Sequence, residues 1–63
     1  SMQHENVEEE VYDLLLRRPC TLEQICASLG ISSAQMTPIM EKLISSKTII
    51  RIVSENGTYY KAS

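Results

Sequence analysis

The 63-residue chain has little of what marks a disordered or membrane-spanning protein. It contains only two glycines and two prolines, and 43% of its residues are hydrophobic, which is typical of an ordinary folded globule. No apolar run approaches the roughly 18 residues of a membrane span, and the acidic start SMQHENVEEE is unlike a signal or transit peptide. We therefore expect a soluble intracellular protein, cytoplasmic or nuclear, with no membrane partner.

Positive charge is also scarce. Six basic side chains against eight acidic ones give a net charge of -2 and a pI near 5.2. This balance argues against strong non-specific attraction to a polyanion, so nucleic-acid binding would require the basic residues to cluster. A chain of this length forms one small domain that buries only ~60% of its unfolded surface. Any more elaborate function would come from partners.

Residues for metal binding or catalysis are few. Cys20 and Cys26 lie in PCTLEQIC without a CxxC pair, and His4 is the remaining soft ligand, so we predict no metal site, disulfide or cofactor. Cys26 is expected to be a small buried residue on a helix, with Cys20 near its start. There is no phosphate loop, and residues 8–10 are glutamates of one helical turn that point in different directions. We expect no enzymatic activity.

Three helices are predicted from their N-terminal caps. The cap and the third helical residue form a hydrogen-bonding pair in each case: Asn6 with Glu9, Thr21 with Gln24, and Ser32 with Gln35. Apolar residues at helical spacing follow each cap. Pro19 is expected to end the first helix, and Gly30 supplies a left-handed turn after the second.

Pro38 is the residue that fits its predicted helix least well. It lies six positions into the third helix, where it removes the backbone bond to Ala34 and clashes with that carbonyl, at a cost of ~3 kcal/mol. A kink, or a helix that restarts at Thr37 with Pro38 as its first residue, would reduce this cost.

The segment TIIRIVSENGTYYKA predicts a β-hairpin with Asn56-Gly57 as a two-residue type I′ turn. The predicted cross-strand pairs are Glu55 with Thr58, Val53 with Tyr60, and Arg51 with Ala62. One face then carries Ile49, Val53 and Tyr60, and the other carries Ile50, Ile52 and Tyr59. Both faces are apolar, so the second either meets another molecule or is covered by sheet twist and the first helix.

Helix, helix, a tight LGIS turn, helix and hairpin is the order of a winged helix-turn-helix domain. The residues that carry the resemblance are Leu22, Ile25, Leu29 to Ser32, Met36, Ile39, Leu43, Ile49, Ile50 and the Asn56-Gly57 turn. The chain resembles this superfamily over residues 7–62, which implies an α+β fold with a three-helix core and a two-stranded wing. Residues 1–6 are expected to be a tag remnant and a flexible N-terminus. The superfamily includes transcription regulators, DNA-processing proteins and protein-docking modules.

A narrower resemblance covers RRPCTLEQICASLGISSAQMTPIMEKLISSKTIIRIVSENGTYYK. This segment is similar to the C-terminal winged-helix domain of the DprA family. The proteins of that family bind single-stranded DNA in natural transformation. A proline precedes an LEQI-like helix there too, and the hairpin has a Gly-x-Tyr-like sequence, here Gly57-Thr58-Tyr59. The resemblance implies a DNA-processing parent protein.

Two functions follow from the predicted fold. The first is nucleic-acid binding, to duplex or single-stranded DNA, through Ser33, Gln35, Thr37, Lys42, Lys47, Arg51 and Lys61. Gln35 can contact adenine or be occupied by helix capping, and the sparse charge predicts weak binding by an isolated monomer.

The alternative is a docking or dimerisation module that uses Ile50, Ile52, Tyr59 and Pro38 to contact a protein partner or a second copy. The near absence of Arg and Lys from the third helix favours the alternative.

Overall fold

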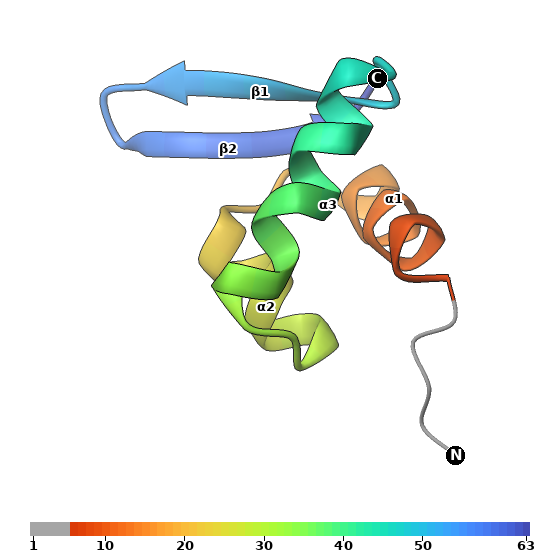
Figure 1. Cartoon of the computed structure of the whole chain (residues 1–63). Coiled ribbons are helices and arrows are strands. Elements are labelled where there is room, and N and C mark those ends of the chain that lie inside the picture. Colours follow the sequence, from red (N-terminus) through yellow and green to blue (C-terminus); the bar gives the residue numbers. More distant parts are fainter. Residues whose placement is uncertain (1–5) are drawn as a thin grey trace.

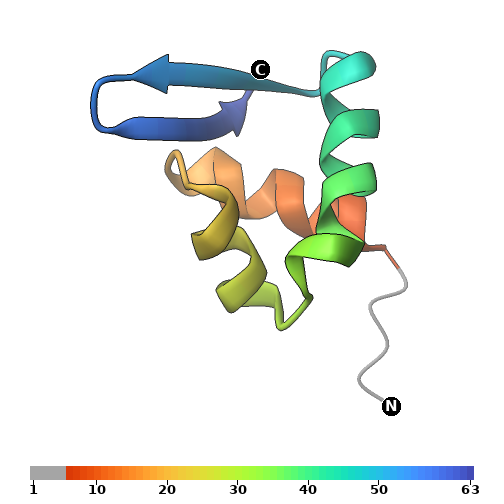
Figure 2. The same cartoon turned by 60° about the vertical axis from the view of Figure 1, so that its left-hand side comes forward.

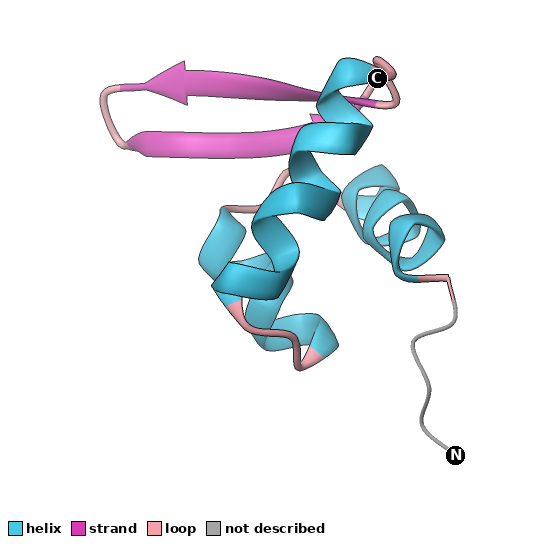
Figure 3. Cartoon of the chain, in the orientation of Figure 1, coloured by secondary structure: helices cyan, strands magenta, loops and turns pink. Residues whose placement is uncertain are grey.

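The computed structural model describes residues 6–63, which form three helices and a hairpin (Figures 1 and 3). The elements are α1 (Val7–Arg17), α2 (Leu22–Leu29), α3 (Ser33–Ser45), β1 (Ile49–Ser54) and β2 (Gly57–Ala62). This order confirms the predicted α+β fold class. Apart from Asn6, the predicted tag remnant and flexible terminus, including His4, lie outside the described residues.

All three predicted caps are present. The cap side chains of Asn6, Thr21 and Ser32 accept the backbone N–H groups of Glu9, Gln24 and Gln35 at 3.2, 3.1 and 3.2 Å. Only Thr21 completes the reciprocal capping box, because its own N–H donates to Gln24 Oε1 at 3.0 Å. Gly30 ends α2 with φ 67 and donates to the Cys26 carbonyl, as predicted. Local sequence alone therefore determines where these helices begin.

The core consists of eight buried side chains from all three helices, the segment before α2 and β1. They are Val11, Leu15, Cys20, Ile25, Met36, Met40, Leu43 and Ile49. Cys26 lies on α2 and Cys20 just before it, as predicted, but the fully buried cysteine is Cys20, which is 1% exposed, whereas Cys26 is only half-buried. Cys20 is enclosed because its backbone pairs with β2, a contact that helical periodicity does not reveal.

Cys20 joins the hairpin to the helices through two backbone hydrogen bonds. Its N–H donates to the Tyr60 carbonyl at 3.0 Å, and the Tyr60 N–H donates back to the Cys20 carbonyl at 2.7 Å. β2 thus lies between Cys20 on one side and β1 on the other, and it also contacts α1. The base of the hairpin is fixed to the helical core, while its tip extends beyond the helices (Figure 2).

The predicted hairpin register is wrong by two residues along β2. Val53 lies opposite Thr58 rather than Tyr60, and the two turn residues are Glu55 and Asn56. The Ser54 hydroxyl closes this turn, since it accepts the Asn56 N–H at 3.3 Å and donates to the Gly57 carbonyl at 3.1 Å. Gly57, with φ 130, begins β2 instead of completing a type I′ turn.

The predicted distribution of side chains between the two hairpin faces is nevertheless confirmed. A shift of two residues preserves the alternation of a strand, so Ile49 and Tyr60 still share one face, and Ile50, Ile52 and Tyr59 share the other. In the observed register the buried Ile49 lies opposite Ala62, and both pack in the core. The register therefore secures the base of the hairpin.

Pro38 lies inside α3, as predicted, and is exposed. The helix runs without a break from Ser33 to Ser45, so the alternative of a helix restarting at Thr37 is wrong. The hydroxyl of Thr37, the residue before Pro38, donates to the Ser33 carbonyl at 2.8 Å and so adds a side-chain hydrogen bond to the first turn of the helix.

The C-terminus of α3 forms a Schellman turn with a lysine in the position that glycine usually occupies. The Lys47 N–H donates to the Ile44 carbonyl and the Thr48 N–H to the Leu43 carbonyl, both at 2.9 Å. Lys47 has φ 63, a left-handed conformation in which a Cβ atom is strained. The turn that directs the chain into β1 therefore stores strain at one exposed residue.

We predict that Lys47→Gly stabilises the domain by about 0.5 to 1 kcal/mol, because glycine adopts this φ without the Cβ penalty. Urea unfolding followed by circular dichroism measures the change. Lys47→Ala removes the same charge but keeps the Cβ atom, so it should give no comparable gain. Equal stabilisation by both variants would show that charge, and not backbone strain, is responsible.

Candidate nucleic-acid interface

The seven residues predicted to contact nucleic acid are all exposed, but they do not form one continuous patch. Successive residues of an α-helix are rotated by about 100° around its axis. Thr37 and Glu41, four residues apart, therefore lie on one side of α3, and Lys42 lies about a further 100° around the helix. The structure thus separates the predicted residues into groups.

Thr37 and Arg51 are brought together at a hollow of about 140 Å3 between α3, the hairpin and the start of α2. The hollow is lined by Leu22, Thr37, Met40, Glu41, Ile44, Arg51 and Tyr60. Its apolar lining residues are buried or half-buried, whereas Thr37, Glu41 and Arg51 are exposed. The site therefore combines one cation, one anion and a hydroxyl around an apolar floor.

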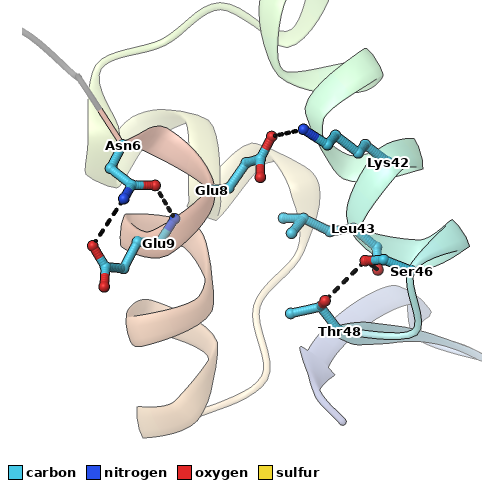
Figure 4. Close-up of polar contacts among 7 residues, drawn as sticks. All are labelled: Asn6, Glu8, Glu9, Lys42, Leu43, Ser46 and Thr48. Atoms are coloured by element: carbon cyan, nitrogen blue, oxygen red, sulfur yellow. Dashed lines mark hydrogen bonds and ion pairs between the residues drawn. The ribbon is translucent and has the colours of Figure 1, made fainter.

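Lys42 faces α1 and not this hollow. Its Nζ lies 2.8 Å from Glu8 Oε2, and the two side chains are 70% and 41% exposed (Figure 4). The pair links α3 to the first turn of α1 and partly neutralises the lysine. Lys42 is therefore less available to a phosphate than its place on α3 suggested.

The remaining predicted residues on α3 lie in its first turn. Gln35 gives its backbone N–H to Ser32, and its Oε1 accepts the Ser32 hydroxyl at 3.4 Å. This favours the capping interpretation of Gln35, although the side chain is exposed. Ser33 is exposed as the first residue of the helix, one turn before Thr37 on a similar side.

The two lysines beyond α3 lie apart from the hollow. Lys47 occupies the turn after α3, and Lys61 is opposite Ile50 on the outer face of the hairpin. Arg51 is on the other face, opposite Tyr60. Arg51 is thus the predicted cation that the structure places at the hollow.

Three of the four residues of the docking alternative share the outer face of the wing, whereas the fourth, Pro38, lies on α3. Ile50 and Ile52 are 39% and 37% exposed, and the half-buried Tyr59 lies opposite Ile52 on the same face. Sequence reasoning missed the exposure of Val53, which is 75% exposed near the hairpin tip. The position of Val53 close to the hairpin turn could have predicted this exposure. Residues near the tip of a hairpin lie beyond a small core, even on an apolar strand face.

No protein-family model and no curated protein matches the chain. Among solved structures, the chain is similar to the adhesin competence repressor AdcR from Streptococcus pyogenes, with a TM-score of 0.86 and 20% sequence identity. The similarity covers 100% of this chain and 49% of AdcR, so the chain spans about half the length of that protein. The chain has a winged-helix fold. Its hairpin, β1 and β2, is the wing.

The narrower resemblance to the DprA family has no support in these comparisons and stays a prediction. Among residues 6–63, no group of three or more His, Cys, Asp or Glu side chains could hold a metal ion. No helix in that part of the chain combines the length and hydropathy needed to cross a membrane.

We predict that the Glu8–Lys42 pair contributes less than about 1 kcal/mol to stability, because both side chains are solvated. A double-mutant cycle with Glu8→Gln and Lys42→Gln, measured by urea unfolding, isolates the coupling. The coupling should fall as salt is raised. A larger, salt-independent coupling would instead identify the pair as a main link between α1 and α3.

Proposed function

We propose that this winged-helix domain binds DNA through α3 and the wing, and that it binds weakly as an isolated monomer. The observation that carries the proposal is the hollow that places Thr37 of α3 and Arg51 of β1 on one face. A helix and an adjoining hairpin on one side of a small domain can contact a groove and its flanking phosphates together. The likeness to a repressor supports the same function.

The hydrogen bonds at the hollow suggest different roles for its polar residues. Thr37 Oγ1 already donates to the Ser33 carbonyl, so in this arrangement it can only accept a further bond. Phosphate oxygens are acceptors, whereas the amino groups of adenine and cytosine are donors in the major groove. Thr37 would therefore contact a base, and Arg51 would contact a phosphate.

Glu41 limits the affinity of this site. Its carboxylate lies on the same hollow as Arg51 and repels an approaching phosphate. Lys42 is paired with Glu8, and the net charge of the chain is -2. Tight binding would therefore need a second copy or other parts of a longer protein, whose linkage raises the effective concentration.

We predict that Arg51→Ala weakens DNA binding by up to about tenfold and lowers the logarithmic salt slope by about 0.9, through loss of one phosphate contact. NMR titration of the labelled domain with duplex and single-stranded DNA, at low and moderate salt, measures both. Lys61→Ala removes the same charge from the opposite face of the wing and should have a smaller effect.

The same titration tests the proposal as a whole. Saturable shifts at Ser33, Thr37 and Arg51 that weaken with salt would support it and identify the preferred strand form. If neither DNA form shifts any of these residues at low salt, the isolated domain does not bind DNA through this face. Equal effects of Arg51→Ala and Lys61→Ala would indicate a general dependence on charge.

We predict that Glu41→Gln raises DNA affinity about two- to fivefold, because it removes a negative charge next to the phosphate site. Fluorescence anisotropy with a labelled duplex measures the change. Asp13→Asn makes the same change in net charge on an exposed position of α1, away from the hollow, and serves as the control. If the two variants increase affinity equally, Glu41 does not face the bound DNA.

Protein docking is a second candidate, favoured by the apolar surfaces. The hollow has an apolar floor formed by Leu22, Met40, Ile44 and Tyr60, and the outer face of the wing exposes Ile50 and Ile52. Docking modules rely on such pockets and need few cations. Under either function, we propose that residues 7–62 act as one intracellular domain without catalytic activity.

A further inference from the structure

The outer edge of β1 is open. The wing sheet has the order β1-β2, and β2 is paired on its other side with Cys20. Two views of the chain show β1 on the outside of the wing, with no helix or strand along its far edge (Figures 1 and 2). Within residues 6–63, β1 is therefore an edge strand that can accept another strand.

The backbone groups on this edge can be identified from the Cys20 bridge. Tyr60 directs both its N–H and its carbonyl at Cys20, so it cannot also bond to Arg51, its partner across the wing. In an antiparallel pair, the two residues of such a non-hydrogen-bonded position point their backbone groups away from each other. Arg51 therefore presents its N–H and carbonyl outward, and by alternation Val53 does the same.

The side chains of β1 do little to protect its edge. Natural edge strands are usually blocked by lysine, proline, a bulge or a covering element. β1 has the sequence IIRIVS, without lysine, proline or glycine, and its ladder to β2 has no bulge. Val53, which directs its backbone groups outward, is 75% exposed. The most exposed of the large hydrophobic residues on β1 thus has a free pairing edge.

We propose that β1 pairs with β1 of a second copy of this chain, antiparallel and centred on Val53, to form a continuous four-stranded sheet. A two-fold axis at Val53 places Val53 opposite its own counterpart and brings Arg51 next to Glu55, the turn residue that follows β1, of the other copy. Two-fold symmetry repeats this ion pair on the other side of the axis. The edge is therefore complementary to itself in charge.

Other registers are less favourable. A two-fold axis at Arg51 would place two arginines opposite each other, and like charges at that position are destabilising. An axis at Ile52 would place Arg51 opposite Val53, with no partner for its charge. An axis at Val53, near the outer end of β1, also keeps the two helical cores at opposite ends of the sheet, because each core adjoins the start of its own β1.

The pairing should be weak. Only the outer half of β1 and the turn take part, so the buried area stays below the ~1,200 Å2 of a standard stable interface. The pairing itself does not depend on DNA binding, and it can be tested without nucleic acid.

Sedimentation equilibrium at low salt, up to millimolar protein, tests the proposal through charge reversal. Arg51→Glu and Glu55→Arg should each weaken dimerisation by about tenfold, because each turns two attractive pairs into repulsive ones. The double variant, with both charges exchanged, should restore it. A monomeric chain at every concentration would overturn the proposal, as would a double variant no better than the single ones.

A second pair of variants separates edge pairing from general surface effects. Val53→Lys places two cations at the two-fold axis and should abolish dimerisation, whereas Thr58→Lys, opposite Val53 but on β2, should leave it intact. Circular dichroism confirms that both variants fold. Hydrogen exchange should show the Arg51 and Val53 amides gaining protection as concentration rises. Protection unchanged by concentration, or dimers lost only in Thr58→Lys, would contradict pairing through β1.

Discussion

The position of the wing depends on two backbone hydrogen bonds between Cys20 and Tyr60. A two-stranded hairpin is marginally stable by itself, and this bridge gives β2 a second paired edge and attaches it to the helices. The burial of Cys20 and Ile49 follows from the same attachment. Because β2 fixes β1, the bridge also sets the distance between Arg51 and α3, and hence the hollow in which a ligand would be held. The hollow is therefore positioned by main-chain atoms of Cys20 and of Tyr60, whose side chain also lines it.

The parts of the fold that were predicted correctly depend on short-range chemistry. The caps at Asn6, Thr21 and Ser32 act within three residues, so a sequence pattern is sufficient to locate them. The hairpin register depends on competition between turns, in which the Ser54 hydroxyl outweighed the preference of Asn-Gly for a type I′ turn. The Cys20 bridge joins residues forty positions apart in the chain, and nothing in the local sequence around Cys20 indicates a partner.

The candidate site was predicted only in part, because its geometry also depends on contacts between elements that are distant in the sequence. Periodicity correctly identified which residues of α3 are exposed. It did not show which of these residues face α1 and which face the wing, because that depends on how the elements pack together. Lys42 meets Glu8 because α1 crosses that side of α3, whereas Thr37 meets the wing. The faces of the wing were correct despite the wrong register, because strand alternation survives a shift of two residues. What the sequence could not supply was the pairing between elements that decides which exposed residues act together.

Pro38 has a consequence for any molecule that packs against α3. A proline has no N–H to donate, so the carbonyl of Ala34, on the exposed side of the helix, lacks its usual helical donor. A partner that covers this side must supply a donor to that oxygen or leave a water molecule bound there. The requirement comes from the helix backbone, so it would persist if every surrounding side chain were changed. The Ala34 carbonyl, in the first turn of α3, is therefore an acceptor that any partner on this face must satisfy.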